Sequence, residues 1–221
     1  MLEPQTLKFL SALKQNNNKP WFDSNRAQYE AARIDFSNFI QLLIDALQKS
    51  DPTITGLSSR DCLFRINRDI RFSKDKTPYK SNMGASIKRG GRKSPFAGYY
   101  FHLEPGNSFI GGGLWMPEAP ALKNMRQEVD YNWNEFNNIL TDPKFKKTYT
   151  DLYKGEDQIL STMPKGYEKD NTAANYLKLK SFIAETRVSD DELIKGSLHK
   201  KTLDAFQALQ PLLQFINRTI E

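Results

Sequence analysis

Apolar residues recur at two different spacings along this chain, and the change of spacing predicts its organisation. Between residues 5 and 47 they recur every three or four positions, which is the pattern of amphipathic helices. We expect one helix over residues 5–17 and a second that begins at an Asn18 cap with Pro20 in its first turn. The clearest helical set ends before a stop signal at residues 50–52 and consists of Phe36, Phe39, Ile40, Leu43, Ile44 and Leu47.

From about residue 62 to residue 115 the spacing changes to two, which predicts extended strands. Residues 64–72 alternate between apolar and polar side chains, so we expect a strand there. Arg68 stands where this alternation requires an apolar residue. Either a bulge turns it outward, or it enters the interior and needs a carboxylate partner. Residues 73–82 predict a loop and residues 83–87 a short strand.

The best hairpin pattern lies between residues 98 and 115. Residues 98–104 alternate, a Pro-Gly-Asn sequence supplies turn chemistry, and residues 108–115 form the return strand. Three consecutive glycines, residues 111–113, lie inside that strand and cost stability unless something approaches the backbone closely. We expect an aromatic side chain such as Tyr100 or Trp115 to pack there.

Helical spacing resumes after Pro117, and Asp142 followed by a proline begins a further short helix. The spacing over residues 153–187 predicts no regular element. Ser189 and Glu192 have the spacing of a capping box, and residues 197–217 predict a final helix or helix pair that is broken near Pro211.

These patterns predict an α+β fold with a central antiparallel sheet (about residues 62–115) flanked by N-terminal and C-terminal helices. We expect a single domain over residues 1–221, since the chain contains no internal repeat and no long linker. It has no apolar stretch near the roughly 20 residues that span a bilayer and no signal-peptide pattern. Its one cysteine, Cys62, cannot form an intramolecular disulfide, so we expect a soluble cytoplasmic protein without membrane contact.

Charge changes the picture, because the basic residues are concentrated in one segment. Residues 65–93 contain ten basic and two acidic residues, a net charge of +8, whereas the whole chain carries +6, so the other 192 residues carry −2. A local basic patch on a nearly neutral protein predicts a local anionic partner. It argues against a broad nucleic-acid-binding face.

The segment from Arg65 to Lys80 is the candidate ligand site. Guanidinium groups bind carboxylate or phosphate oxygens in pairs, and ammonium groups add point charges. We expect an anionic small molecule or phosphorylated ligand there; a short nucleic acid is compatible but not favoured. The alternative is that the arginines pair with internal carboxylates. The candidate ligand-binding residues are Arg65, Arg68, Arg71, Lys74, Lys76, Tyr79, Lys80 and Tyr100.

Two other hypotheses stay open. The chain could be an enzyme on a phosphorylated or carboxylated substrate, with His102, Glu104 and Asp69 as acid–base candidates. It could instead bind a protein partner through the basic loop at residues 88–93. We expect no metal and no cofactor, because no His or Cys pair has zinc-site spacing and no nucleotide-binding glycine motif is present. The sequence does not establish a reaction or an oligomeric state.

Four motifs, in order, resemble those of one bacterial and fungal family, domain of unknown function 2461 (DUF2461). They are R-I-N-R-D-I-R-F-S-K-D-K-T-P-Y-K (65–80), G-Y-Y-F-H-L-E-P (98–105), G-G-G-L-W-M-P (111–117) and P-K-G-Y (164–167). The resemblance covers nearly the whole chain and implies a single domain. It implies no activity, cofactor or catalytic residue.

Overall fold

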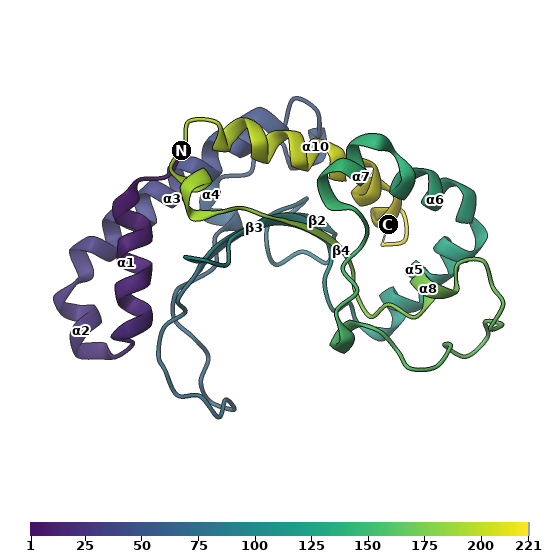
Figure 1. Cartoon of the computed structure of the whole chain (residues 1–221), viewed down its shortest axis with the longest axis horizontal. Helices are drawn as coiled ribbons and strands as arrows, with labels where there is room; N and C mark the ends of the chain where they lie inside the picture. The colour runs from purple at the N-terminus through teal and green to yellow at the C-terminus, as the bar shows by residue number, and fades with distance from the viewer. Residues whose placement is uncertain (221) are drawn as a thin grey trace. The chain divides into compact units, whose positions relative to one another are not determined.

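The computed structural model describes residues 1–220, which form ten α-helices, two 3-10 helices and one four-stranded antiparallel sheet (Figure 1). The α+β class predicted from the spacing is therefore confirmed. The elements are α1 (Pro4–Gln15), α2 (Lys19–Ser24), α3 (Arg26–Leu47), η1 (Pro52–Ile54), α4 (Ser59–Cys62), β1 (Met83–Ile87), β2 (Gly98–Leu103), β3 (Phe109–Leu114), α5 (Ala119–Tyr131), α6 (Trp133–Thr141), α7 (Pro143–Tyr149), η2 (Glu156–Gln158), α8 (Ala174–Leu177), β4 (Phe182–Arg187), α9 (Asp190–Leu193) and α10 (Leu198–Asn217). The strands lie in the sheet in chain order, β1-β2-β3-β4.

The described residues group into two compact units. The first unit contains Met1–Ser94, Tyr100–Ile110 and Arg187–Asp204, and the second contains the rest of the described chain. The division runs through β2, β3, β4 and α10, so each of these four elements contributes residues to both units.

The core of the first unit is built where α3 meets β2. Phe36 and Phe39 of α3 hold the ring of Phe101 at centroid distances of 6.0 and 5.2 Å, and all three are buried. Because side chains alternate across a strand, Tyr100 and His102 lie on the other face of β2. The apolar stripe predicted for α3 is thus confirmed as a core face. The side chains of β2 on the opposite face of the strand, Tyr100 and His102, are polar.

The core of the second unit is centred on Phe136 of α6. Its ring contacts those of Tyr176, Phe182 and Phe215 at centroid distances of 5.4, 6.4 and 5.2 Å. Phe182 begins β4, the strand for which the sequence predicted no element. The alternation in β4 is short, since only Phe182 and Ala184 are buried, so periodicity alone could not identify it.

The expected strand over residues 64–72 is wrong. The segment between α4 and β1 is irregular and pairs only through isolated bridges from Leu63 to Ala85 and from Asn67 to Tyr79. In Figure 1 it extends as a long loop away from α3 and α4. An alternating pattern predicts a strand only if a partner strand buries one face, and here Phe72 is 96% exposed.

The glycine run in β3 is approached by backbone, which corrects the expectation of an aromatic side chain. A Cβ on Gly113, whose φ is +126°, would lie 2.0 Å from the carbonyl oxygen of Phe182 in β4. A Cβ on Gly111 would lie 2.2 Å from that of Ala184. The ring of Tyr100 instead covers Gly84 in β1, where a Cβ would come within 2.5 Å of its hydroxyl oxygen. The glycines therefore permit close strand pairing.

Local capping signals were more reliable than the predicted helix break. The Asn18 side chain accepts the Trp21 amide at 3.0 Å, and the Ser189 capping box forms as expected. The break near Pro211 is wrong, because α10 continues through it. Pro211 and Gln207, the residue one turn before it, are both exposed, so the lost hydrogen bond falls on the exposed side of the helix.

Candidate functional site

The basic segment divides into a root and a tip. The Arg68 amide donates to the Pro78 carbonyl at 2.9 Å, and the Lys80 amide donates to the Ile66 carbonyl at 2.8 Å. These bonds bring the two ends of the segment together. We call residues 64–68 and 78–81 the root and residues 69–77 the tip.

Arg68 closes the tip. Its guanidinium group donates to the carboxylate of Asp75, to the hydroxyl and carbonyl oxygens of Thr77, and to the Ser73 hydroxyl. The Asp75 carboxylate also accepts the Thr77 amide at 2.9 Å. Hydrogen bonds from Thr77 and Arg68 lower the pKa of Asp75 to about 2. Arg68 thus has a carboxylate partner, as the second alternative required, but the pair lies in an irregular loop with Asp75 exposed and not in the interior, so its charge is compensated within the loop.

Most of the other charges in the tip also have partners. Arg71 makes a two-pronged contact to the Asp69 carboxylate, with N–O distances of 2.9 and 2.7 Å. The Lys76 ammonium donates to the Ile70 carbonyl at 2.9 Å. Lys74 is exposed and has no partner among the described residues. Asp69, an acid–base candidate, is therefore bound to Arg71 in the tip.

Tyr79 belongs to an apolar cluster. Its ring is buried and stacks on Phe22 at a centroid distance of 3.9 Å. The side chain of Asn17 accepts the Tyr79 amide and donates to the Tyr79 carbonyl, at 3.1 and 2.8 Å. These contacts anchor the root to the end of α1 and the start of α2.

The root contains two cations without a carboxylate partner. Within residues 1–220, neither Arg65 nor Lys80 forms a salt bridge. The Lys80 ammonium lies 5.4 Å from the centre of the Phe64 ring and is half-buried. Burial and the nearby charge of Arg65 lower its pKa. The root therefore concentrates positive charge that no salt bridge within the described residues neutralises.

A row of polar side chains on β2 borders this root. The Tyr100 hydroxyl lies 3.2 Å from Nδ1 of His102, and Nε2 of His102 lies 3.3 Å from a carboxylate oxygen of Glu104. Since a carboxylate only accepts, Nε2 carries the proton in this arrangement, and Nδ1 accepts from Tyr100. The Phe64 ring meets Tyr100 edge-on at 6.3 Å. The row and the root are thus in contact through the rings of Tyr100 and Phe64.

The surroundings of His102 keep it neutral. Its ring stacks on Phe109 at 4.7 Å, and the Arg187 guanidinium lies 5.8 Å from the centre of the same Phe109 ring. Burial lowers the pKa of His102 below its usual value of 6.5, the charges of Arg187 and Lys80 lower it further, and Glu104 opposes them. His102 is therefore an uncharged imidazole at neutral pH.

Glu104 is the ionised end of the row. Burial raises its pKa, but hydrogen bonds from Asn107 and His102 and the charge of Lys14 outweigh that effect, so the pKa lies below its usual value. The carboxylate accepts from Asn107 at 3.0 Å and lies 3.6 Å from the Lys14 ammonium. The Ser81 hydroxyl lies 3.3 Å from it. The carboxylate is well solvated by protein donors, which favours its charged form.

The predicted site residues thus fall into three groups. Five belong to the root or to the polar row, namely Arg65, Lys80, Tyr100, His102 and Glu104. Five lie in or close the tip, namely Arg68, Asp69, Arg71, Lys74 and Lys76, and Tyr79 is in the core. The sequence reasoning missed Lys14, Ser81, Asn107, Phe109 and Arg187, which contact the row from elsewhere in the first unit. No local pattern marks them, because their proximity arises only on folding.

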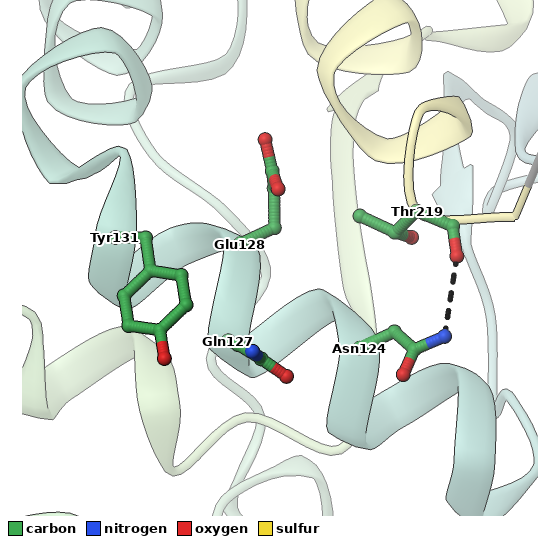
Figure 2. A pocket seen from close by; sticks show the side chains of 5 residues that line it. All are labelled: Asn124, Gln127, Glu128, Tyr131 and Thr219. Carbon is green, nitrogen blue, oxygen red and sulfur yellow. Dashed lines mark hydrogen bonds between the residues drawn. The ribbon is translucent and has the colours of Figure 1, made fainter.

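Other features of the chain do not join this cluster. In the basic loop at residues 88–93, the Arg92 guanidinium donates to the carbonyls of Arg60 and Asp61 at 3.1 Å. A shallow polar hollow in the second unit lies between α5 and the turn after α10 (Figure 2). There the Asn124 amide donates to the Thr219 carbonyl at 3.4 Å. Within residues 1–220, no three His, Cys, Asp or Glu side chains are grouped to hold a metal ion, and no helix is long and apolar enough to cross a bilayer.

Comparison with known proteins gives one match. A family model described as "Conserved hypothetical protein (DUF2461)" matches residues 5–215. No curated protein and no solved structure matches the chain significantly.

Proposed function

The chain belongs to the DUF2461 family, and because that membership assigns no ligand, we propose from the geometry of the root that the protein binds an anionic small molecule there. The ligand carries a phosphate or carboxylate group that lies against Arg65 and Lys80, beside the Tyr100–His102–Glu104 row. We also propose that the protein is located in the cytoplasm. The single cysteine of the chain, Cys62, is a free buried thiol, which suits a reducing compartment.

The uncompensated charge of the root is the observation that supports this proposal. A half-buried ammonium group without a counter-ion is unfavourable, and a second cation nearby makes it more so. Lys80 is in this position beside Arg65. A bound anion would remove the penalty. The arginines of the tip do not offer the same binding energy, because Arg68 and Arg71 already hold carboxylates.

The enzyme hypothesis has one observation in its favour, the linked row of Tyr100, His102 and Glu104. Both ring nitrogens of His102 already have hydrogen-bond partners, so a proton from a ligand would reach His102 only through the Tyr100 hydroxyl. Burial raises the pKa of Tyr100 to about 12. The hydroxyl is therefore a donor at neutral pH, and the row is better suited to orienting a bound anion than to removing a proton.

The test is a thermal shift with pyrophosphate, sulfate and citrate at low salt. Lys80→Met removes the charge and keeps the side-chain stem over Phe64. We expect wild type to gain about 5 to 10 °C in Tm at 100 times the Kd of a bound anion. Lys80→Met and Arg65→Gln should each lose most of this gain. Arg33→Gln, which removes an exposed arginine of α3 paired with Glu30, is the control and should keep it.

Two results would overturn the proposal. One is a wild-type protein that none of the three anions stabilises. The other is a stabilisation that Lys80→Met and Arg65→Gln retain in full. The stability without ligand gives an independent check, because removing an uncompensated cation should leave Lys80→Met at least as stable as wild type.

A further inference from the structure

The most exposed large apolar side chain among the described residues is at the tip. Phe72 is 96% exposed, ahead of Tyr131 at 75%. The loop that carries it is held in shape by the hydrogen bonds of Arg68 to Ser73, Asp75 and Thr77. A phenyl ring that an ordered loop holds exposed to solvent indicates an interaction site.

The charge around Phe72 indicates an anionic partner. The tip and Arg68 together have four basic and two acidic residues, and both acidic side chains are already paired with arginines. The Arg71 guanidinium lies 5.9 Å from the centre of the Phe72 ring, and Lys74 has no partner. One guanidinium group thus accompanies the exposed ring, and the ring remains open to stacking.

The root repeats this arrangement. Phe64 is 43% exposed, and the Lys80 ammonium lies 5.4 Å from its ring centre, with Arg65 next in the chain. The basic segment therefore presents two exposed aromatic rings, each with its own cation, eight positions apart along the chain. An anionic membrane surface would account for the exposed ring of the tip, but it gives no reason for a second ring with its own cation at the root. A partner that contacts both the root and the tip would need negative charges and flat apolar groups in alternation along its length.

We infer that the root and tip together bind single-stranded nucleic acid. Unpaired bases stack on Phe72 and Phe64, and phosphates lie against Lys74 at the tip and against Arg65 and Lys80 at the root. Stacking on aromatic rings combined with a cationic path is the usual recognition of single strands. This inference rests on the proposed anion site, since it takes the phosphate groups of a nucleic acid, in place of a small molecule, as the anions that occupy it. It is compatible with a nearly neutral remainder of the chain, because only one segment makes contact.

The experiment measures fluorescence anisotropy of a labelled single-stranded oligonucleotide of about 12 nucleotides. Phe72→Ala should weaken binding about 10-fold, and Phe72→Trp should keep it and show quenching of the new indole. Tyr131→Ala, which removes an exposed ring from the second unit, is the matched control and should bind like wild type. Lys74→Ala should reduce the slope of log K against log salt by about 0.7, while Lys169→Ala, the loss of another exposed lysine, should not.

The outcomes separate this inference from the proposed function. If pyrophosphate stabilises the protein through Arg65 and Lys80 but the oligonucleotide binds equally to wild type and Phe72→Ala, the anion site stands and the nucleic-acid inference is wrong. If none of pyrophosphate, sulfate and citrate stabilises the protein and the oligonucleotide binds equally to wild type and Phe72→Ala, both are wrong. Equal affinity for a duplex of the same length would contradict stacking. Phe72-dependent binding to phosphatidylserine vesicles, without oligonucleotide binding, would overturn the inference in favour of a membrane surface.

Discussion

The basic residues of this chain differ in what their charge is used for. Arg68 and Arg71 are neutralised by Asp75 and Asp69 within the tip. Arg65 and Lys80, from the same stretch of sequence, have no carboxylate partner in the described part of the chain. Two adjacent positive charges without a counter-ion raise the local potential far more than their share of the net charge suggests. The candidate site is defined by this difference and not by the number of basic residues.

His102 should make anion binding depend on pH. Its pKa lies below 6.5, and the groups that face it are Tyr100, Glu104, Lys80 and Arg187. As the pH falls through this lowered pKa, the imidazole gains a positive charge beside Lys80. We expect affinity for sulfate, whose charge is constant near neutral pH, to rise severalfold, and His102→Gln to abolish the rise. Titration calorimetry over about pH 5 to 8 measures it.

The same group gives a second readout in stability. Since the folded pKa of His102 is lower than the unfolded one, its contribution is fully present above about pH 6.5 and is lost as the pH falls through the folded value. The free energy of unfolding of His102→Gln should therefore decline less than that of wild type over this range. An NMR titration that places the pKa of His102 at 6.5 or above would contradict both expectations.

At the level of elements, the loop between α4 and β1 shows why alternation failed as a signal. Its two ends pair through Arg68 and Lys80 amides with the Pro78 and Ile66 carbonyls, and most charged side chains of the tip bond to groups of the same loop. The tip is therefore held by the hydrogen bonds of its own loop, without pairing to a sheet edge and without burial of its apolar residue Phe72. Because Asp75 has a pKa of about 2 when folded, this closure should hold down to about pH 4 and weaken as the pH falls toward 2.

Pro211 gives a prediction for α10. It lies on the exposed side of the helix, and its ring removes one backbone hydrogen bond to Gln207. Pro211→Ala restores that bond and the helix propensity, while the more flexible unfolded chain offsets part of the gain. We expect the free energy of unfolding to rise by about 1 to 3 kcal/mol, measured by urea denaturation. Gln214→Ala, at an exposed position one turn later, should change it little, and a destabilised Pro211→Ala protein would refute the expectation.

At the scale of the whole molecule, the division into two units does not follow element boundaries. Strands β2, β3 and β4 and helix α10 each have residues in both units. An element that unfolds in one unit loses its continuation in the other, so we propose that the chain folds as one domain.

We accordingly expect a single unfolding transition. Calorimetric and van't Hoff enthalpies should agree, and the tryptophans at positions 21, 115 and 133 should report the same midpoint as far-UV circular dichroism. The first of these residues is in the first unit and the other two are in the second. Two separated transitions, or a midpoint that differs between fluorescence and circular dichroism, would show independent domains.

The sequence by itself determined the local features of this protein. Helical spacing identified α3, capping residues identified the starts of α2 and α9, and the turn residues identified the β2–β3 hairpin. The α+β class and the position of the basic segment were also predictable. These features depend on side chains a few positions apart, whose interactions the order of residues largely dictates.

Only the tertiary structure decided which charges are available and what lies beside them. Asp75 removes Arg68 from the candidate site, and Phe109 and Arg187 come to His102 from distant positions in the chain. It also showed that β4, not an aromatic ring, requires the glycines of β3. Such contacts join residues far apart in sequence, and a charge is neutralised or left exposed by its neighbours in space, which local spacing does not specify.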